Sequence, residues 1–362
     1  MAKLGDICTH QSSNIKQSDL ENNNGSYPIY GASGLIKNVD FYKQEKPYVA
    51  IVKDGAGVGR VMQLPAYSSV IGTMQYIIPN SDTDVKYLAY AMEHMNLSKY
   101  YSGATIPHIY FKDYKNEYIK EHNTETQHKI ANNLDKVTHT IDLCNAILEK
   151  LDLLVKSRFI EVFGSITKRR KLEEYADLIT KGASPKWQGI DYAEEGTLFV
   201  TSENVREGYL DFTKKKYLPN DINKILPRSV LKRNDILINI VNASIGRVAV
   251  YDSDELANIN QAVALVRLKP NALNITFLLT FLNSEEALRA YDFMKVGGDK
   301  ANLSLKNISD LLIPVADLEL QEKFATFVEQ IDKSKLAVKQ VLEKAETLKK
   351  ALMQEYFGQE KL

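Results

Sequence analysis

A segment that occurs twice constrains this chain of 362 residues more than any other feature. Residues 125–131 (Glu-Thr-Gln-His-Lys-Ile-Ala) return at 319–325 as Glu-Leu-Gln-Glu-Lys-Phe-Ala, displaced by 194 residues (319 − 125). The same displacement relates Leu148-Glu149-Lys150 to Leu342-Glu343-Lys344, and Phe163-Gly164 to Phe357-Gly358. Repetition at one fixed displacement indicates that one structural unit has been built twice.

The spacing of the repeated parts predicts a domain organisation. Lys3-Leu4 corresponds to Lys171-Leu172 at a displacement of 168, so the second globular part is about 26 residues longer than the first (194 − 168). We predict an α+β fold with two similar α/β domains at residues 1–120 and 165–316. Two long helices, at residues 121–164 and 317–362, are expected to alternate with them.

Apolar residues in both helical segments repeat in steps of four and three. The first series is Ile130, Leu134, Val137, Ile141, Cys144, Leu148, Leu151 and Val155, and the second is Phe324, Val328, Ile331, Lys335, Val338, Leu342, Ala345, Lys349, Leu352 and Tyr356. This heptad spacing favours an antiparallel coiled coil over two independent surface helices. Lys335 and Lys349 occupy seam positions, where they either set the register or mark an exposed end.

The globular parts read as short strands followed by helices. We predict strands at 48–52, 60–64 and 70–79, with counterparts at 235–241, 246–251 and 262–268. Helices are predicted at 85–95 and 275–290.

A glycine run at 55, 57 and 59 follows the first predicted strand and resembles a cofactor-binding loop. A dinucleotide or S-adenosylmethionine site would need a helix to open at these glycines, yet the sequence that follows looks extended and soon reaches Pro65. In the second copy Gly246-Arg247-Val248 answers Gly59-Arg60-Val61, but the other two glycines have no counterparts. We therefore predict a turn between two strands.

Composition and motif searches exclude several classes of protein. With 44% hydrophobic and 25% charged residues the chain is globular, and it contains no apolar stretch long enough for a transmembrane helix or a signal peptide. Cys8 and Cys144 form no paired motif, so we expect a cytoplasmic protein without disulfides, a metal site or a membrane partner. We find no Pro-Pro-aromatic methyltransferase motif, phosphate loop or His-Glu-x-x-His, so no catalytic residue is predicted.

Basic, aromatic and amide side chains do gather in the predicted loops. Such residues suit phosphate contacts and base-edge reading, although the 46 basic residues only balance the 46 acidic ones. We predict that DNA contacts come from Tyr30, Lys37, Lys53, Arg60, Tyr101 and His108 in the first part, and from Ser184, Lys186, Trp187, Asn204, Asn242, Ser244, Arg247, Lys300 and Asn302 in the second.

The whole chain resembles the DNA specificity subunit of type I restriction-modification systems. The residues that carry the resemblance are 27–34 (Tyr-Pro-Ile-Tyr-Gly-Ala-Ser-Gly), 54–60 (Asp-Gly-Ala-Gly-Val-Gly-Arg) and 181–187 (Lys-Gly-Ala-Ser-Pro-Lys-Trp). Both halves also contain Gly-x-x-x-x-His/Asn before the repeated helix start. The exit reads Tyr118-Ile119-Lys120 in the first half and Leu312-Ile313-Pro314 in the second, a departure that affects only the local turn.

The resemblance implies a function. Each globular part would be a target-recognition domain that reads one half of a split DNA site, and the helices would hold the two domains with pseudo-two-fold symmetry. Two modification subunits that use S-adenosylmethionine to methylate adenine N6 would dock on this chain, and restriction subunits driven by ATP with Mg would join them. The chain itself would hold no cofactor and would not be an enzyme.

Three alternatives differ from this reading. One is the recognition subunit of a related system whose cleavage and methylation activities share one polypeptide. Another is a methyltransferase in its own right, which the missing motif disfavours. The third is a coiled-coil scaffold that carries protein-binding heads.

Overall fold

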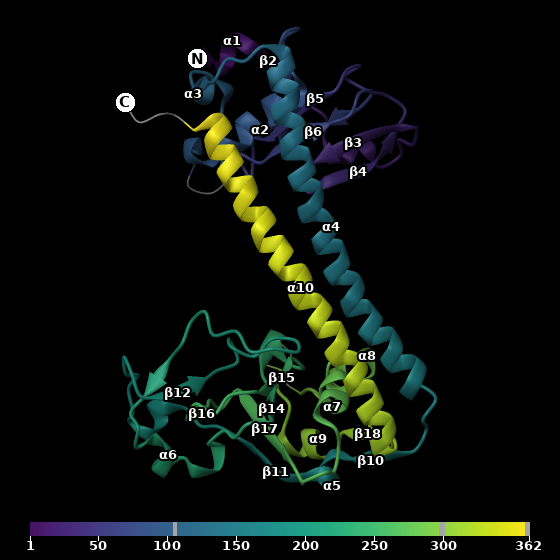
Figure 1. Ribbon diagram of the computed structural model, residues 1–362, viewed down its shortest axis with the longest axis vertical. Helices are drawn as coiled ribbons and strands as arrows, with labels where there is room; N and C mark the ends of the chain where they lie inside the picture. The colour runs from purple at the N-terminus through teal and green to yellow at the C-terminus, as the bar shows by residue number, and fades with distance from the viewer. Residues whose placement is uncertain (104–106, 297–300, 359–362) are drawn as a thin grey trace. The chain divides into compact units, whose positions relative to one another are not determined.

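The computed structural model describes residues 1–103, 107–296 and 301–358. The chain divides into two compact units, one formed by Met1–Ala146 with Val338–Leu362 and the other by Ile147–Ala337 (Figure 1). Two helices of 40 residues each, α4 (Thr124–Phe163) and α10 (Leu318–Phe357), contribute to both units. We call the globular portion before α4 the first head, and the portion between α4 and α10 the second head.

The first head contains two main sheets. A four-stranded sheet has the order β2-β8-β5-β6, and a three-stranded sheet has the order β4-β3-β7. A two-residue pair, β1 and β9, joins the start of the head to its end. The strands are β1 (Ala2–Lys3), β2 (Cys8–Ser12), β3 (Tyr27–Gly31), β4 (Gly34–Val39), β5 (Tyr48–Val52), β6 (Val61–Leu64), β7 (Ser69–Val70), β8 (Met74–Pro79) and β9 (Tyr118–Ile119). The helices are α1 (Leu4–Ile7), η1 (Gln17–Leu20), α2 (Val85–His94), η2 (Leu97–Tyr100) and α3 (Phe111–Tyr114).

The second head repeats this arrangement. Its sheets have the orders β11-β17-β14-β15 and β13-β12-β16, and β10 pairs with β18. The strands are β10 (Arg169–Lys171), β11 (Ala176–Lys181), β12 (Thr197–Val200), β13 (Tyr217–Leu218), β14 (Asp235–Asn239), β15 (Val248–Tyr251), β16 (Ala257–Ile259), β17 (Val263–Leu268) and β18 (Leu312–Pro314). The helices are α5 (Leu172–Tyr175), η3 (Pro185–Gln188), α6 (Ile222–Ile225), η4 (Pro227–Ser229), η5 (Asn242–Ser244), α7 (Ile275–Leu282), α8 (Glu285–Met294) and α9 (Leu305–Ser309).

The match between the heads extends to strand direction. β3 runs parallel to β7 and antiparallel to β4, and β12 has the same relations to β16 and β13. The predicted duplication and the α+β class are therefore confirmed.

Two predicted elements are divided in the structure. The strand expected at 70–79 is β7 and β8, because the chain leaves the three-stranded sheet at a turn in which Met74 N–H donates to Ile71 O (3.0 Å). The helix expected at 275–290 is α7 and α8. Ser284 caps α8 by accepting from Ala287 N–H, while the Asn283 amide bonds the backbone of Val248 in β15.

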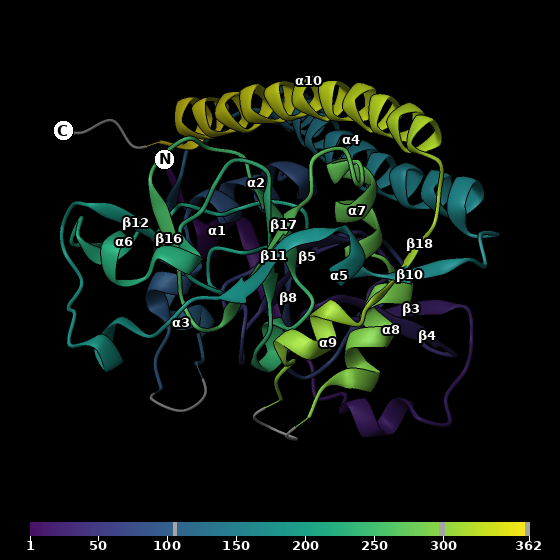
Figure 2. The same cartoon turned by 90° about the horizontal axis from the view of Figure 1, so that it is seen from below.

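The long helices pack antiparallel within each unit. In the first unit Ile130 and Leu134 near the start of α4 share a core with Met353 and Phe357 near the end of α10. In the second, Phe159 near the end of α4 lies 5.5 Å from Phe324 near the start of α10, measured between ring centres. Phe277 of α7 joins this aromatic cluster, so α7 packs between the sheet and the helices (Figure 2).

The two seam lysines belong to the packing and do not mark exposed ends. Lys335 Nζ lies 2.6 Å from Asp152 Oδ1 of α4, and Lys349 Nζ donates to Glu93 Oε1 of α2 at 2.9 Å. Only about a fifth of each lysine side chain is exposed (20% and 23%). Lys335 therefore ties α10 to α4, and Lys349 ties α10 to α2 of the first head.

The glycine run forms the predicted turn. β5 pairs antiparallel with β6, and Gly59 N–H donates to Val52 O at 2.8 Å. Gly59 has φ +85°, and a Cβ on it would lie 2.5 Å from Ser98 N. Gly246 occupies the same place in the second head with φ +84°.

We expect Gly59→Ala to lower the free energy of unfolding by about 2–4 kcal/mol, because left-handed backbone strain adds to a clash with main chain that cannot move aside. Gly34→Ala is the control. It also has positive φ (+114°), but a Cβ there meets open space, so only about 1 kcal/mol should be lost. Chemical denaturation of both variants measures the difference, and equal losses would show that the approach to Ser98 is unimportant.

Within the described residues, no helix combines the length and apolar character that crossing a membrane requires.

Candidate nucleic-acid interface

Most of the predicted contact residues of the first head lie at one end of its four-stranded sheet. The partners Ser12↔Gln75 and Val52↔Met74 show that β2, β8 and β5 share this end. The turn between β5 and β6 meets the segment before α3 there, since Ile109 N–H donates to Lys53 O (3.0 Å) and Gly55 N–H to Pro107 O (2.9 Å).

These hydrogen bonds bring four predicted residues together. The His108 Nδ1 atom contacts the Asp54 carboxylate, and Lys53 Nζ lies 3.8 Å from the same carboxylate. Arg60 is exposed and anchors one guanidinium nitrogen on Ala32 O at 2.8 Å. Tyr101 is 59% exposed beside this cluster, in the segment whose Ser102 pairs with His108. Basic and aromatic groups therefore converge on the turn.

The second head builds the same end from different side chains. Leu303 N–H donates to Ile240 O (2.9 Å) and Asn242 N–H to Ala301 O (2.8 Å), which repeats the pattern of the first head. Asn242 and Asn302 are exposed, Arg247 is half-buried, and the Ser244 hydroxyl donates to Val241 O at 3.0 Å. Asn242 has φ +53°, where the first head has Gly55. Lys300 lies outside the described residues.

The short helix η3 leaves from this end as well. Lys181 at the end of β11 pairs with Ala264, next to the Asn239↔Val263 pair that ends β14. η3 then carries Lys186, which is exposed, and Trp187, which is 82% exposed, with Ser184 just before them. An indole this exposed is available for stacking or groove contacts rather than for the core.

Three predicted contact residues lie away from the sheet end or already use their polar groups in hydrogen bonds within the protein. Tyr30 lies half-buried in β3 and packs against a core cluster. Lys37 of β4 donates to Leu20 O at 2.9 Å. Asn204 is only 4% exposed. Its position argues against direct base contact.

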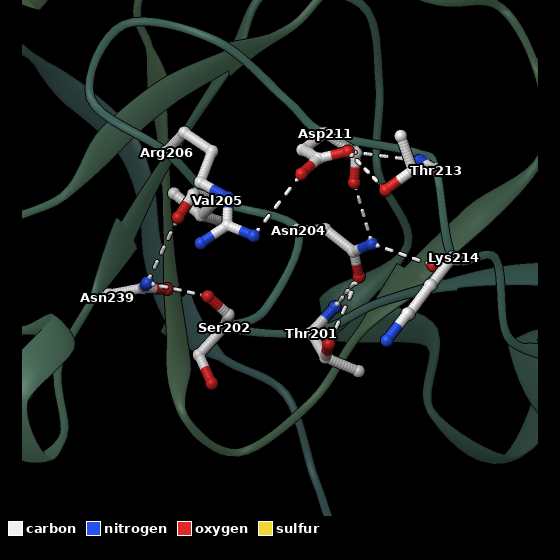
Figure 3. A network of polar contacts seen from close by, with 9 residues as sticks. All are labelled: Thr201, Ser202, Asn204, Val205, Arg206, Asp211, Thr213, Lys214 and Asn239. Carbon is white, nitrogen blue, oxygen red and sulfur yellow. Dashed lines mark hydrogen bonds and ion pairs between the residues drawn. The ribbon is translucent and has the colours of Figure 1, made fainter. Parts of the chain in front are cut away.

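Asn204 instead organises the long connection that follows β12. Its Oδ1 accepts from Thr201 N–H (2.9 Å) and from the Thr201 hydroxyl (3.0 Å), and its Nδ2 donates to Asp211 O (2.9 Å) and Lys214 O (3.1 Å) (Figure 3). Hydrogen bonds from the Thr213 N–H and hydroxyl, together with Arg206, lower the pKa of Asp211. Asp211 is therefore charged at neutral pH and holds Arg206 at 3.2 Å.

Sequence reasoning missed two features of the site. Tyr110 is 49% exposed and packs against His108 with the rings tilted by 54° and their centres 4.1 Å apart. Lys112 Nζ lies 5.1 Å from the centre of the Tyr110 ring. The second is the place of the connection after β12, because the sequence marks its four basic residues at 206 and 214–216 as loop residues but does not show where the loop lies. Only the topology shows that this connection takes the place of a two-residue turn in the first head.

In the described part of the chain, no three His, Cys, Asp or Glu side chains gather as candidate metal ligands. The fold and the two polar sheet ends define a class of protein: a duplicated recognition module carried on paired helices. A family model for the type I restriction modification DNA specificity domain matches residues 1–153 and 167–347. The chain therefore belongs to the type I restriction-modification DNA specificity family, whose members recognise DNA sequence and are not catalysts. The resemblance inferred from the sequence is confirmed.

Curated relatives carry the same description. The chain is 23% identical over 295 residues to the type I restriction enzyme MjaVIII specificity subunit of Methanocaldococcus jannaschii, which covers 76% of this chain and 69% of that protein. It is 24% identical over 260 residues to the EcoBI specificity subunit of Escherichia coli, covering 64% of this chain. The chain spans about half (54%) of the length of the EcoBI subunit.

Solved structures share the fold. The S subunit of a type I restriction-modification system from M. genitalium matches with a TM-score of 0.62 at 15% identity, over 99% of this chain and 96% of that one. A second structure, described as the basis of complex assembly and conformational transition of the type I system, matches with a TM-score of 0.57 at 16% identity, over 98% and 96%.

Proposed function

We propose that this chain reads a bipartite DNA site, with each head reading one half-site. The observation that carries the proposal is the matched sheet end of the two heads. The same backbone hydrogen bonds shape the turn that carries Lys53 and Arg60 in one head and the turn that carries Asn242 and Arg247 in the other. One scaffold therefore presents two different sets of side chains, as a reader of two different half-sites requires.

We also propose that two modification subunits dock on the long helices. Ile147 and Leu154 of α4 are 42% and 46% exposed, and Val341 and Leu348 of α10 are both 49% exposed. These pairs occupy equivalent repeat positions (147 + 194 = 341 and 154 + 194 = 348), and seven-residue spacing places each pair on one helix face. Equivalent apolar surfaces suit two copies of one partner.

Replacing one docking pair should remove one partner. We expect Ile147→Lys with Leu154→Lys, or Val341→Lys with Leu348→Lys, to reduce the number of bound modification subunits from two to one, since lysine keeps the helix but blocks apolar contact. Native mass spectrometry of the reconstituted complex measures the stoichiometry. Asn145→Lys, on a different face of α4, is the control, and a double variant that still binds two subunits would contradict this docking surface.

The chemistry of modification would belong to the partners. S-adenosylmethionine, ATP and Mg would bind the modification and restriction subunits, and this chain would supply DNA recognition in the cytoplasm. The experiment that tests the proposal is the mapping of methylated adenines after reconstitution with the modification subunits, which should yield two short half-sites separated by an unspecified spacer.

A further inference from the structure

The heads differ most in the connection between the first two strands of the three-stranded sheet. In the first head β3 ends at Gly31 and β4 begins at Gly34, so two residues form the turn. In the second head β12 ends at Val200 and β13 begins at Tyr217, which leaves sixteen residues (201–216). We call this segment the β12–β13 loop. The next connection is also longer in the second head, with sixteen residues (219–234) against eight (40–47), but the β12–β13 loop makes the larger difference.

The β12–β13 loop borders the sheet end that carries the candidate DNA contacts. Asn239 Nδ2, at the end of β14, donates to Ser202 O (2.9 Å) and Val205 O (3.4 Å). Gly208 N–H donates to Val248 O at 2.8 Å, directly after the turn that contains Asn242 and Arg247. In the first head the corresponding neighbours are also joined, because Arg60 bonds Ala32 O.

The side chains of the loop suit a phosphate backbone and bases. Lys214 is exposed. Tyr209 is 60% exposed. Arg206 and Lys216 are held by carboxylates of the same loop, Asp211 at 3.2 Å and Glu203 at 2.8 Å, so these cations are fixed in position. Fixed cations lose less side-chain freedom when they bind a ligand.

The loop is ordered by two buried amides. Asn204 closes the loop on itself through four hydrogen bonds, as described above, and Asn239 fastens its first residues to β14. Asn239 is fully buried, and its Oδ1 has no partner among the described residues. The equivalent residue in the first head is Val52, which ends β5 where there is no long loop to hold.

We propose that Asn204 and Asn239 are positioning residues that pre-form the β12–β13 loop as a DNA-reading element found in the second head alone. The inference rests on the proposed function, because the loop reads DNA only if the heads do. Neither amide touches DNA on this account. Both act through Arg206, Tyr209 and Lys214, whose positions they set.

Asn239→Val tests the inference without weakening the strand. Valine is the residue of the first head, favours strands, and removes a buried acceptor that lacks a partner. We expect only a small change in thermal stability, because the lost hydrogen bonds to Ser202 O and Val205 O oppose the gain from removing the unpartnered Oδ1. We also expect faster hydrogen exchange within 201–216, and a roughly tenfold loss of discrimination at the second half-site in the complex with modification subunits. The first half-site should be methylated as before.

Asn204→Ala should have the same selective effect, and Asn258→Ala is its matched control. Asn258 is fully buried in the same head and donates to Asn223 Oδ1 (3.0 Å) and Leu226 O (3.1 Å), away from the loop. The control should lower stability without relaxing the second half-site.

The outcomes separate the two proposals. If Asn239→Val and Asn204→Ala leave discrimination at the second half-site unchanged, or if Asn258→Ala relaxes it equally, the positioning role is wrong and the proposed function stands. If the wild-type complex shows no bipartite specificity, the proposed function is wrong, and the positioning role that rests on it is wrong as well.

Discussion

Replacing Trp187 with alanine is expected to relax recognition of one half-site and leave the other intact. Trp187 is 82% exposed on η3, at the sheet end of the second head, and its removal changes no core contact. A lost base-edge contact costs about 1–3 kcal/mol, or roughly 5-fold to 150-fold in discrimination. Because the second head has its own sheets, this loss should stay within its own half-site.

Arg60→Ala is the corresponding variant in the first head. Arg60 is anchored on Ala32 O beside Lys53 and His108, all in the first head. It should weaken the other half-site by a similar factor if it reads a base, or lower affinity without changing preference if it contacts a phosphate. Binding of both variants, assembled with modification subunits, to DNA libraries randomised at either half-site gives the measurement. Equal disturbance of both half-sites by each variant would exclude two separate readers.

Lengthening both long helices by one heptad is expected to lengthen the DNA spacer. Seven residues inserted after Leu148 and seven after Leu342 preserve the four-three seam and add about 10 Å to each helix. That length corresponds to about three base pairs of B-DNA, which also turn the second half-site by roughly 100°. We expect a spacer longer by two or three base pairs, with both half-site sequences unchanged.

A four-residue insertion at the same positions is the control. It takes the seam out of phase and should lower the melting temperature before it changes the spacer. Mapping of methylated adenines reads the spacer directly. A fully active heptad variant with the original spacer would show that the helices do not set the distance between half-sites.

The sequence repeat made the architecture predictable, because two segments of similar sequence are expected to fold and pack in the same way. The seam of α4 and α10, the turn at Gly59, and the strands β5 and β14 follow from local spacing. The spacing of apolar residues could not show that the helix predicted at 275–290 is divided into α7 and α8. The break depends on hydrogen bonds between the Asn283 amide and the backbone of β15. Nor could this spacing show that Lys335 and Lys349 pair with Asp152 and Glu93, which lie far away in sequence.

Contact residues were less predictable than architecture. Loop composition selected Arg60, Trp187 and Asn242 together with Asn204, since all are polar or aromatic residues between strands. Burial distinguishes the buried residue from the exposed ones. The Asn204 amide donates hydrogen bonds to backbone carbonyls of its own loop, whereas Trp187 remains exposed. Whether an amide faces solvent or its own main chain depends on tertiary structure, which composition does not encode.

The most direct measurement exchanges one head for another and maps the DNA site. We would replace the second head with that of a relative of known specificity, keep α4, α10 and the first head, and map methylated adenines produced with the modification subunits. The account predicts a hybrid site in which one half-site and the spacer are retained and the other half-site becomes that of the donor. A site in which both half-sites change together, or in which neither changes, would contradict the claim that each head reads its own half.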